Sequence, residues 1–316
     1  MNNPGMLVHH KSTDVDNVIS PVAQLIAGKS SKIQYTDLDG QLQTIDYGHL
    51  AELDPYPIPM PIDREGYGTV EGSAHHWATG QCDWLNVQSA MERYLPPRPD
   101  HQPVRLLDFG CATGRFLRHP TLSTTETIDA WGCDFSPENI QWNKQHLPPQ
   151  VKTFLNNANP HLPFPDGHFD VITAFSVFTH IDQFEDAWLL ELRRITQPDG
   201  LLYLTTQNDA MWKIAPTRPS YVKHLAHANT VHGNPVIVTE KMYQHPMPMD
   251  RIVFRMSESD VYNCNVWHSN HYLRTHWSRY FDIHHIAATA HGNFQSPVIM
   301  SPLGSTSSKG PAAKPR

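Results

Sequence analysis

Two aspartates and the small residues between them have the types and spacing needed to bind a nucleoside. The stretch LLDFGCATGRFLRH, residues 106–119, runs from an apolar segment through Asp108 to Gly110 and Gly114. Glycine lets the backbone turn tightly and approach a ligand, and the free N–H groups of a following helix attract negative charge. Asp134 ends the next apolar segment, where a carboxylate can accept hydrogen bonds from ribose hydroxyls. This pattern predicts a nucleoside cofactor.

The order of residues in this loop favours a cofactor that carries an ammonium group over a dinucleotide. A dinucleotide-binding loop reads G-x-G-x-x-G, whereas this loop reads G-C-A-T-G, with Cys111 and Ala112 after the first glycine. Asp108 precedes that glycine, and a carboxylate there would repel a pyrophosphate but attract an ammonium. Alanine at position 112 is expected to be tolerated if its backbone angles are ordinary.

Strands alternating with helices must position these residues. Continuous apolar runs predict strands at 104–109, 128–134, 169–178 and 201–207, and helical spacing predicts helices at 137–147 and 184–196. A further helix is expected to begin near Arg115 and to be shortened by Pro120. Such alternation predicts an α/β fold with a mostly parallel sheet covered on both faces, in which ligands bind at the carboxyl ends of the strands.

The rest of the chain differs in texture from this core, which is expected to span 101–208. Residues 1–100 combine polar segments, the proline-rich stretch DPYPIPMPIDREGYG and a helix at 77–95, and are expected to cap the core. An insertion rich in His, Met and Pro at 209–262 is expected to supply the acceptor pocket. A final helix and strands then follow at 263–303, and residues 304–316 have the composition of a disordered tail.

The segment from about 104 to 207 resembles class I S-adenosylmethionine-dependent methyltransferases. DFGCATGR is similar to the first motif of that family, with Ala112 in place of the central glycine. The segments ANPHLPFPDGHFDVITAFSVFTHI and QPDGLLYLTTQ are similar to those that form its fourth and fifth strands, most closely in bacterial members. The resemblance implies a Rossmann-like fold with a mostly parallel seven-stranded sheet. It also implies S-adenosyl-L-methionine as cofactor, and O- or N-methylation of a small organic acceptor such as a sugar or secondary metabolite.

The resemblance also implies roles for individual residues. Asp108 and the loop residues Gly110, Cys111, Ala112 and Gly114 would hold the methionine part of the cofactor, Asp134 the ribose, and Phe135 would cover the adenine. Asn157, Ala158 and Phe175 complete the expected cofactor site. His180, just beyond the fourth strand, is predicted to be a general base, because a neutral imidazole accepts a proton near physiological pH. The alternative is that His180 only caps the strand end or lines the pocket.

Composition excludes several other classes of function. The formal net charge is −7 with 24 Lys and Arg, so no basic surface for nucleic acid is expected. No apolar stretch approaches the ~20 residues of a membrane span, and the N-terminus lacks a secretory signal. The cysteines, at 82, 111, 133 and 264, show no CxxC spacing, which indicates reduced thiols in the cytoplasm rather than a zinc site or disulfides. The composition does not decide whether the protein is a monomer or a homo-oligomer.

Several conspicuous side chains have competing explanations. The histidines of HSNHYLRTH (His268, His271 and His276) are spaced for a metal site, but no acid or cysteine lies among them, so no metal is expected and a surface or pocket position is favoured. Asp182, Glu185 and Asp186 are expected to stabilise a helix start. Tyr67, Trp77 and Trp84 are expected in the core or a lid rather than at the acceptor.

Two other classes of function remain as alternatives at this point. A nicotinamide-dependent oxidoreductase is disfavoured by the G-C-A-T-G spacing and by Asp108. The other alternative is a non-catalytic S-adenosylmethionine-binding protein, which would have the same cofactor loop as an enzyme and is therefore not distinguished by that loop.

Overall fold

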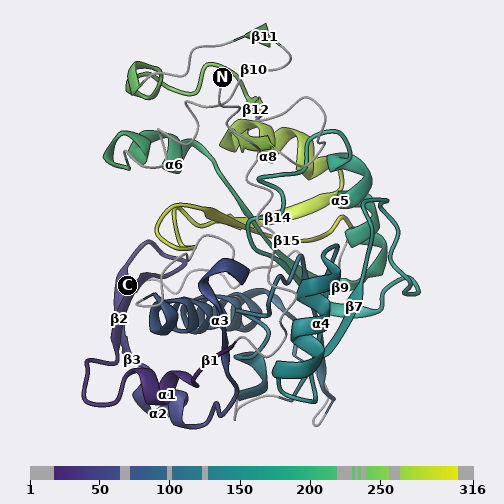
Figure 1. Ribbon diagram of the computed structural model, residues 1–316. Coiled ribbons are helices and arrows are strands. Elements are labelled where there is room, and N and C mark those ends of the chain that lie inside the picture. Colours follow the sequence, from purple (N-terminus) through teal and green to yellow (C-terminus); the bar gives the residue numbers. More distant parts are fainter. Residues whose placement is uncertain are drawn as a thin grey trace, which may run out of the picture.

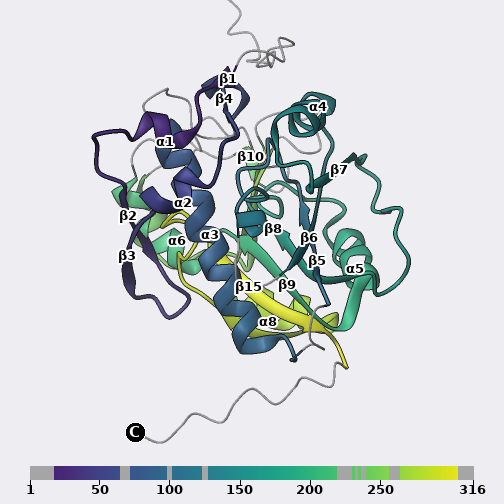
Figure 2. The same cartoon turned by 90° about the horizontal axis from the view of Figure 1, so that it is seen from below.

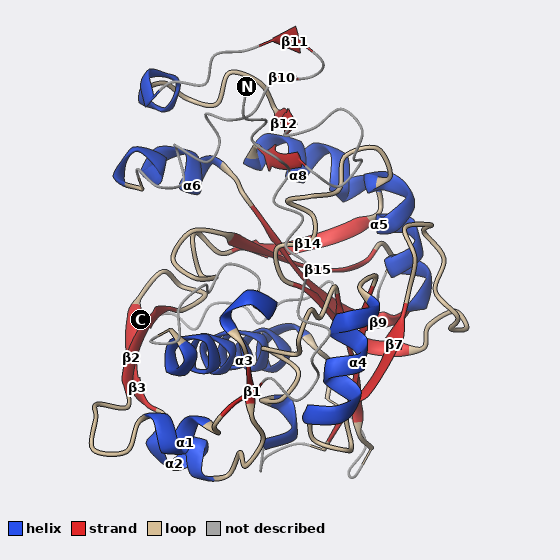
Figure 3. Ribbon diagram, in the orientation of Figure 1, coloured by secondary structure: helices blue, strands red, loops and turns tan. Residues whose placement is uncertain are grey.

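A seven-stranded sheet forms the centre of the protein in the computed structural model (Figures 1 and 3). The structure describes residues 18–64, 72–97, 102–122, 127–218, 230–231, 234–235, 240–255 and 264–304. The strand order is β14-β15-β9-β8-β5-β6-β7. The strands are β5 (Val104–Phe109), β6 (Ile128–Asp134), β7 (Lys152–Leu155), β8 (Phe169–Ala174), β9 (Thr196–Thr206), β14 (Phe281–Ile286) and β15 (Ser296–Pro302). Strands β5 to β9 pair in parallel, whereas β15 runs antiparallel to both its neighbours, so the predicted mostly parallel sheet is confirmed.

Helices cover both faces of this sheet because successive strand residues point to opposite sides. Leu106 belongs to a core cluster with α3 (Ser73–Tyr94) and α4 (Pro137–His146). Its neighbour Leu107 belongs to a second cluster with α5 (Glu185–Ile195) and α8 (Asn270–His276), which η5 (Trp277–Arg279) follows. The Rossmann-like arrangement places the carboxyl ends of β5, β6 and β8 at one edge of the sheet.

Local sequence signals explain where α4 and α5 begin and end. The Ser136 hydroxyl accepts a hydrogen bond from the N–H of Asn139 at 3.2 Å, and Pro137 occupies the first position of α4. Proline is favoured there because its missing N–H would have no partner in any case. Helix α5 carries acidic residues in its first turn and arginines in its last, which complements the helix dipole.

The N-terminal region packs against α3 and against the loop that follows β5 (Figure 2). It contains β1 (Val18–Ile19), α1 (Val22–Leu25), β2 (Lys32–Thr36), β3 (Leu42–Asp46), α2 (Gly48–Glu52), β4 (Ile58–Pro59) and η1 (Pro61–Asp63). Trp77 and Trp84 of α3 are buried, and the Trp77 indole donates a hydrogen bond to Asp54 at 2.6 Å. Asp54 also pairs with Arg118 at 2.9 Å, and both side chains are buried. This ion pair attaches the N-terminal region to the loop after β5.

The helix expected near Arg115 is absent, and this prediction was wrong. Residues 112–119 form consecutive turns, followed by the short 3-10 helix η2 (Pro120–Leu122). Gly114 has a left-handed φ of 72°, and Pro120 has no N–H to donate, so the helical pattern is broken at both ends of this segment. Tertiary contacts hold the segment instead, since the His119 ring packs edge-on against Trp77 with centroids 4.6 Å apart.

The chain after β9 builds a second, smaller sheet of order β11-β10-β12-β13, seen at the top of Figure 1. Its strands are β10 (Thr230–Val231), β11 (Asn234–Pro235), β12 (Arg251–Arg255) and β13 (Cys264–His268), accompanied by α6 (Asp209–Ile214), η3 (Ala215–Thr217) and η4 (Glu240–Gln244). Strand β13 lies beyond residue 262, where the insertion was expected to end. Tyr67 and the expected tail from 305 onward lie outside the described residues.

Candidate functional site

The loop after β5 has the backbone of a ligand-binding turn. The N–H groups of Gly110 and Cys111 both donate to the carbonyl of Cys133 at 2.9 Å, which ties the loop to the end of β6. Gly110 has a φ of 76°, and a Cβ at this position would lie 2.4 Å from Cγ2 of Val177. Gly110 is therefore required both by its backbone angle and by the close approach of the segment after β8.

Ala112 does not have the ordinary backbone angles on which its tolerance was expected to depend. Its φ is 45°, in the left-handed region that costs an alanine roughly 1–2 kcal/mol. Two hydrogen bonds hold it there: its N–H donates to Asp134 at 2.8 Å, and its carbonyl accepts from the Asn143 amide at 2.8 Å. The loop thus keeps its shape without the family's central glycine.

Asp108 is a buried carboxyl group at the end of β5, with 3% of the residue exposed. The Thr173 hydroxyl on β8 donates to its Oδ1 at 2.8 Å. Burial raises the pKa of Asp108 to about 7, which outweighs the lowering effect of Thr173 and of the Arg115 charge. Because burial makes the negative charge of this carboxylate unfavourable, a bound cation would stabilise it, so the site fits an ammonium group.

Asp134 ends β6 beside this loop. Its Oδ2 accepts from the N–H of Ala112, and its Oδ1 accepts from the N–H of Ser136 at 2.9 Å and from the Asn139 amide at 3.1 Å. These bonds fix the carboxylate at the strand end, where ribose hydroxyls would meet it. Phe135 follows with 68% of its surface exposed, so its ring is accessible beside the end of β6.

Asn157 and Ala158 follow the neighbouring strand β7, and both are exposed. The N–H of Asn156 donates to the carbonyl of Asp134 at 3.1 Å, which places this segment beside the end of β6. The structure therefore brings residues 108–114, 134–135 and 157–158 to one edge of the sheet, in the order β5, β6 and β7.

The other side of the loop holds a cluster of charged and aromatic residues, of which the sequence analysis named only Phe175. Asp83 of α3 pairs with Arg115 at 2.6 Å and with Nδ1 of His291 at 2.8 Å. The ring of Phe175, which follows β8, lies 5.2 Å from the ring of His291 and 5.8 Å from the Arg115 guanidinium. No local pattern signals this cluster, because its members come from four separate segments of the chain.

His180 lies farther along the segment after β8 and is exposed. Its Nδ1 is 2.7 Å from the carbonyl of Cys264, and the Cys264 thiol contacts the His180 carbonyl at 3.3 Å. These contacts join His180 to β13 of the second sheet. Its role as a general base stays a prediction.

Asp182 and Glu185, near the start of α5, form an ion-pair network with the second sheet, which is more than the helix-stabilising role expected of them. Arg251 of β12 pairs with Glu185 at 2.7 Å and with Asp182 at 2.9 Å. His268 lies 3.3 Å from Glu185 and is fully buried, so its expected surface or pocket position was wrong. Burial opposes ionisation of Glu185, but the charges of His268 and Arg251 lower its pKa to about 2.

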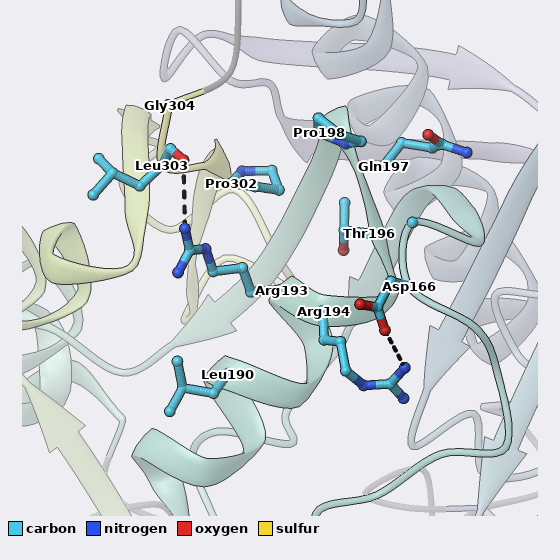
Figure 4. A pocket seen from close by; sticks show the side chains of 11 residues that line it. Asp166, Leu190, Arg193, Arg194, Thr196, Gln197, Pro198, Pro302, Leu303 and Gly304 are labelled. Carbon is cyan, nitrogen blue, oxygen red and sulfur yellow. Dashed lines mark hydrogen bonds and ion pairs between the residues drawn. The ribbon is translucent and has the colours of Figure 1, made fainter.

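A cavity of about 640 Å³ lies at the opposite edge of the sheet (Figure 4). It is lined by the end of α5, the start of β9 and the end of β15, including Arg193, Thr196 and Leu303. The Arg194 guanidinium beside it is paired with Glu191 and Asp166. This cavity is therefore separate from the candidate cofactor site.

Other types of site are not evident in the described part of the chain. No three His, Cys, Asp or Glu side chains there are arranged to hold a metal ion. All the cysteines are buried as free thiols. None of the described helices is both long enough and apolar enough to cross a membrane.

Sequence comparison identifies the family. The family model described as "Methyltransferase domain" matches residues 84–293, more than half of the chain. The chain therefore belongs to the methyltransferase domain family, and its resemblance to class I S-adenosylmethionine-dependent methyltransferases is confirmed.

Curated relatives match over part of their length. The mitochondrial ubiquinone biosynthesis O-methyltransferase of Saccharomyces cerevisiae is 27% identical over 131 residues, 40% of this chain and 41% of the yeast protein. The ubiquinone/menaquinone biosynthesis C-methyltransferase UbiE of Burkholderia cenocepacia is 30% identical over 102 residues, 30% of this chain and 40% of that protein. The chain thus spans about two fifths of the length of these relatives.

Solved structures add a more distant likeness. An S-adenosylmethionine-dependent methyltransferase from Mesorhizobium loti aligns with 70% of this chain and 97% of its own at 12% identity, with a TM-score of 0.45. A similar protein from Listeria monocytogenes, described as an S-adenosylmethionine-dependent methyltransferase, aligns with 71% of this chain and 99% of its own at 12% identity, with a TM-score of 0.45.

Proposed function

We propose that this protein is an S-adenosylmethionine-dependent methyltransferase that acts on an oxygen or nitrogen atom of a small organic acceptor. The observation that carries the proposal is the position of Asp108, a buried carboxyl beside a left-handed glycine loop, at the same sheet edge as Asp134. The membership of the methyltransferase domain family supports the same conclusion.

Each part of the site has a task in this proposal. The buried carboxyl of Asp108 binds the ammonium of the methionine part, Asp134 binds the ribose hydroxyls, and Phe135 covers the adenine. When bound, S-adenosylmethionine supplies a methyl group on an electrophilic sulfonium. The work of the chain is therefore to hold the acceptor in line with that methyl and to exclude water.

The acceptor belongs on the side of β8 and β9, because the other strand ends are assigned to the cofactor. The insertion after β9 lies on that side and is tied to it by the bridge between Gln207 and Trp267. The yeast and Burkholderia relatives are described as acting in quinone biosynthesis. A small ring with hydroxyl groups is thus a suitable first acceptor to test, beside sugars and secondary metabolites. The buried free thiols fit a reducing compartment, and we place the protein in the cytoplasm.

Ligand-dependent thermal melting tests the cofactor assignment. A ligand that binds only the folded state at a hundredfold excess over its Kd stabilises it by about 2.7 kcal/mol. S-adenosylmethionine and its demethylated product S-adenosylhomocysteine should raise the Tm, whereas NAD should not. Asp134→Ala should remove most of that rise. Asp129→Ala is the matched control, since Asp129 lies on the same strand but pairs with Lys152. A rise with NAD, or none with S-adenosylmethionine, would contradict the proposal.

Methyl transfer itself is tested with an isotopically labelled donor and a small-molecule extract, in which a labelled product should form. Cofactor binding without any labelled product would favour a non-catalytic binding protein.

A further inference from the structure

His291 and Asp83 are far apart in the sequence but form a buried pair in the structure. His291 lies in the loop between β14 and β15, and its N–H and carbonyl both hydrogen-bond with Gln295 at 3.0 Å. Asp83 lies on α3 and approaches Nδ1 of the imidazole at 2.8 Å. Both residues are at most 5% exposed. The pair therefore has a fixed geometry, set by a helix on one side and a closed turn on the other.

The second ring nitrogen of His291 is left for a ligand. With Nδ1 donating to Asp83, Nε2 is the acceptor of a neutral imidazole. Among the described residues, no protein atom hydrogen-bonds to Nε2. This nitrogen is not completely buried either, so it is partly accessible to a ligand. An imidazole oriented by a carboxylate, with its other nitrogen open, is the arrangement of a general base.

The pair lies where an acceptor would meet the cofactor. The cofactor residues run from β7 through β6 to β5, so the reacting end faces the next strands, β8 and β9. Phe175 follows β8, and its ring contacts both His291 and, at 4.8 Å between centroids, Phe116 of the cofactor loop. The charge of Asp83 also acts on Asp108, which places the cluster beside the expected ammonium site.

We propose that His291, oriented by Asp83, is the general base that takes the proton from an acceptor hydroxyl. The inference rests on the proposed function. In this step the acceptor oxygen bonds to the methyl carbon, the carbon–sulfur bond breaks with its electron pair left on sulfur, and the hydroxyl proton moves to Nε2. The negative charge of Asp83 then stabilises the imidazolium.

The charged and titratable groups around the pair of His291 and Asp83 come from three elements. Asp83 is on α3, Arg115 follows β5, and Tyr203 is on β9. Burial opposes ionisation of Asp83, but the charges of His291 and Arg115 keep its pKa below the ordinary value. Burial first, and then the charge of Asp83, raise the pKa of Tyr203 far above its ordinary value, so the phenol stays neutral.

Comparing two ligands tests this placement without knowledge of the acceptor. S-adenosylmethionine carries a sulfonium charge that S-adenosylhomocysteine lacks, while both carry the same ammonium and carboxylate. The titration of Asp108 acts on the ammonium of both ligands and more weakly on the sulfonium, so the effect of His291 is the part of the change in the ratio of the two Kd values, measured by calorimetry, that a His291 variant removes. A protonated His291 beside the sulfonium should weaken only the binding of S-adenosylmethionine.

The expected result is a ratio of Kd for S-adenosylmethionine over S-adenosylhomocysteine that rises about tenfold from pH 8 to pH 5.5, which is about 1.4 kcal/mol. His291→Asn should remove most of this rise, because an amide takes up no proton in this pH range, while its N–H can still donate to Asp83. His285→Asn is the matched control and should leave the rise intact, whereas His180→Asn tests the competing assignment. His285 lies on the same hairpin but contacts the carbonyl of Leu38.

The outcomes separate the two proposals. If both ligands bind but the ratio does not change with pH, or if His291→Asn keeps the change, the base assignment is overturned and the proposed function stands. If the change disappears in His180→Asn instead, His180 is the group beside the sulfonium. Failure of both ligands to bind overturns both proposals. With a hydroxyl acceptor found by the labelled-donor screen, His291→Asn should lower turnover at least ~100-fold, and a loss of less than threefold would contradict the role.

Discussion

Replacing Asp108 by asparagine should stabilise the ligand-free protein while weakening its binding of cofactor. Burial raises the pKa of Asp108 from 3.8 to about 7. Because the folded-state pKa lies above the unfolded value, stability is greatest below the unfolded pKa and is lost as the pH rises through the folded pKa. The shift of about 3 pKa units corresponds to a loss of about 4 kcal/mol at pH values above 7.

Asparagine removes this pH-dependent cost, and its side-chain oxygen can still accept the hydrogen bond from Thr173. Urea unfolding of both proteins without ligand, from pH 5 to pH 8, measures the effect. The stability of Asp108→Asn relative to wild type should increase by about 3 kcal/mol over this range, since most of the shift lies between these pH values. Asp129→Asn, on an exposed pair at the other end of β6, should show no such trend.

Ligand binding gives the opposite result if the carboxylate serves the cofactor. The affinity of Asp108→Asn for S-adenosylmethionine and S-adenosylhomocysteine should fall by at least tenfold, because both ligands lose the same charge partner. The reasoning would be refuted if the difference in stability between the two proteins did not vary with pH. A variant that bound the cofactor as tightly as wild type would remove Asp108 from the ammonium site.

Two further predictions concern the loop and the second sheet. Gly110→Ala should lower the Tm and the cofactor affinity more than Gly40→Ala does. Both glycines have a φ of 76°, but only at Gly110 would the added Cβ meet a side chain, that of Val177. Equal effects of the two substitutions would contradict this close approach. Glu185→Gln should destabilise the fold by about 3 kcal/mol, because Arg251 and His268 would lose their buried counter-charge. Because the pKa of Glu185 is lowered to about 2, the stability that its carboxylate contributes is complete above pH 4.5 and is lost as the pH falls toward 2. A difference in stability between wild type and Glu185→Gln that persisted at pH 2 would contradict this account.

The core of the fold and the clustering of most candidate cofactor residues at one edge of the sheet were predictable because short stretches of sequence encode them. The strands 104–109 and 128–134 were predicted with the bounds that the structure shows, since buried parallel strands are continuous apolar runs. Gly110 directly follows the first of these strands, and Asp134 is the last residue of the second. Parallel pairing then brings the strand ends to one edge, which is why residues 24 positions apart could be placed together from sequence.

Tertiary packing decided the features that have no local signal. The segment after Gly114 forms turns rather than the expected helix, and its Arg118 and His119 make buried contacts with Asp54 and Trp77. Asp83 and His291 are separated by 208 positions, and neither stands in a recognisable motif. They meet only because α3 packs against the hairpin of β14 and β15. Spacing along the chain determined the loop after β5, whereas the packing of distant elements determined which acid and which histidine lie beside that loop.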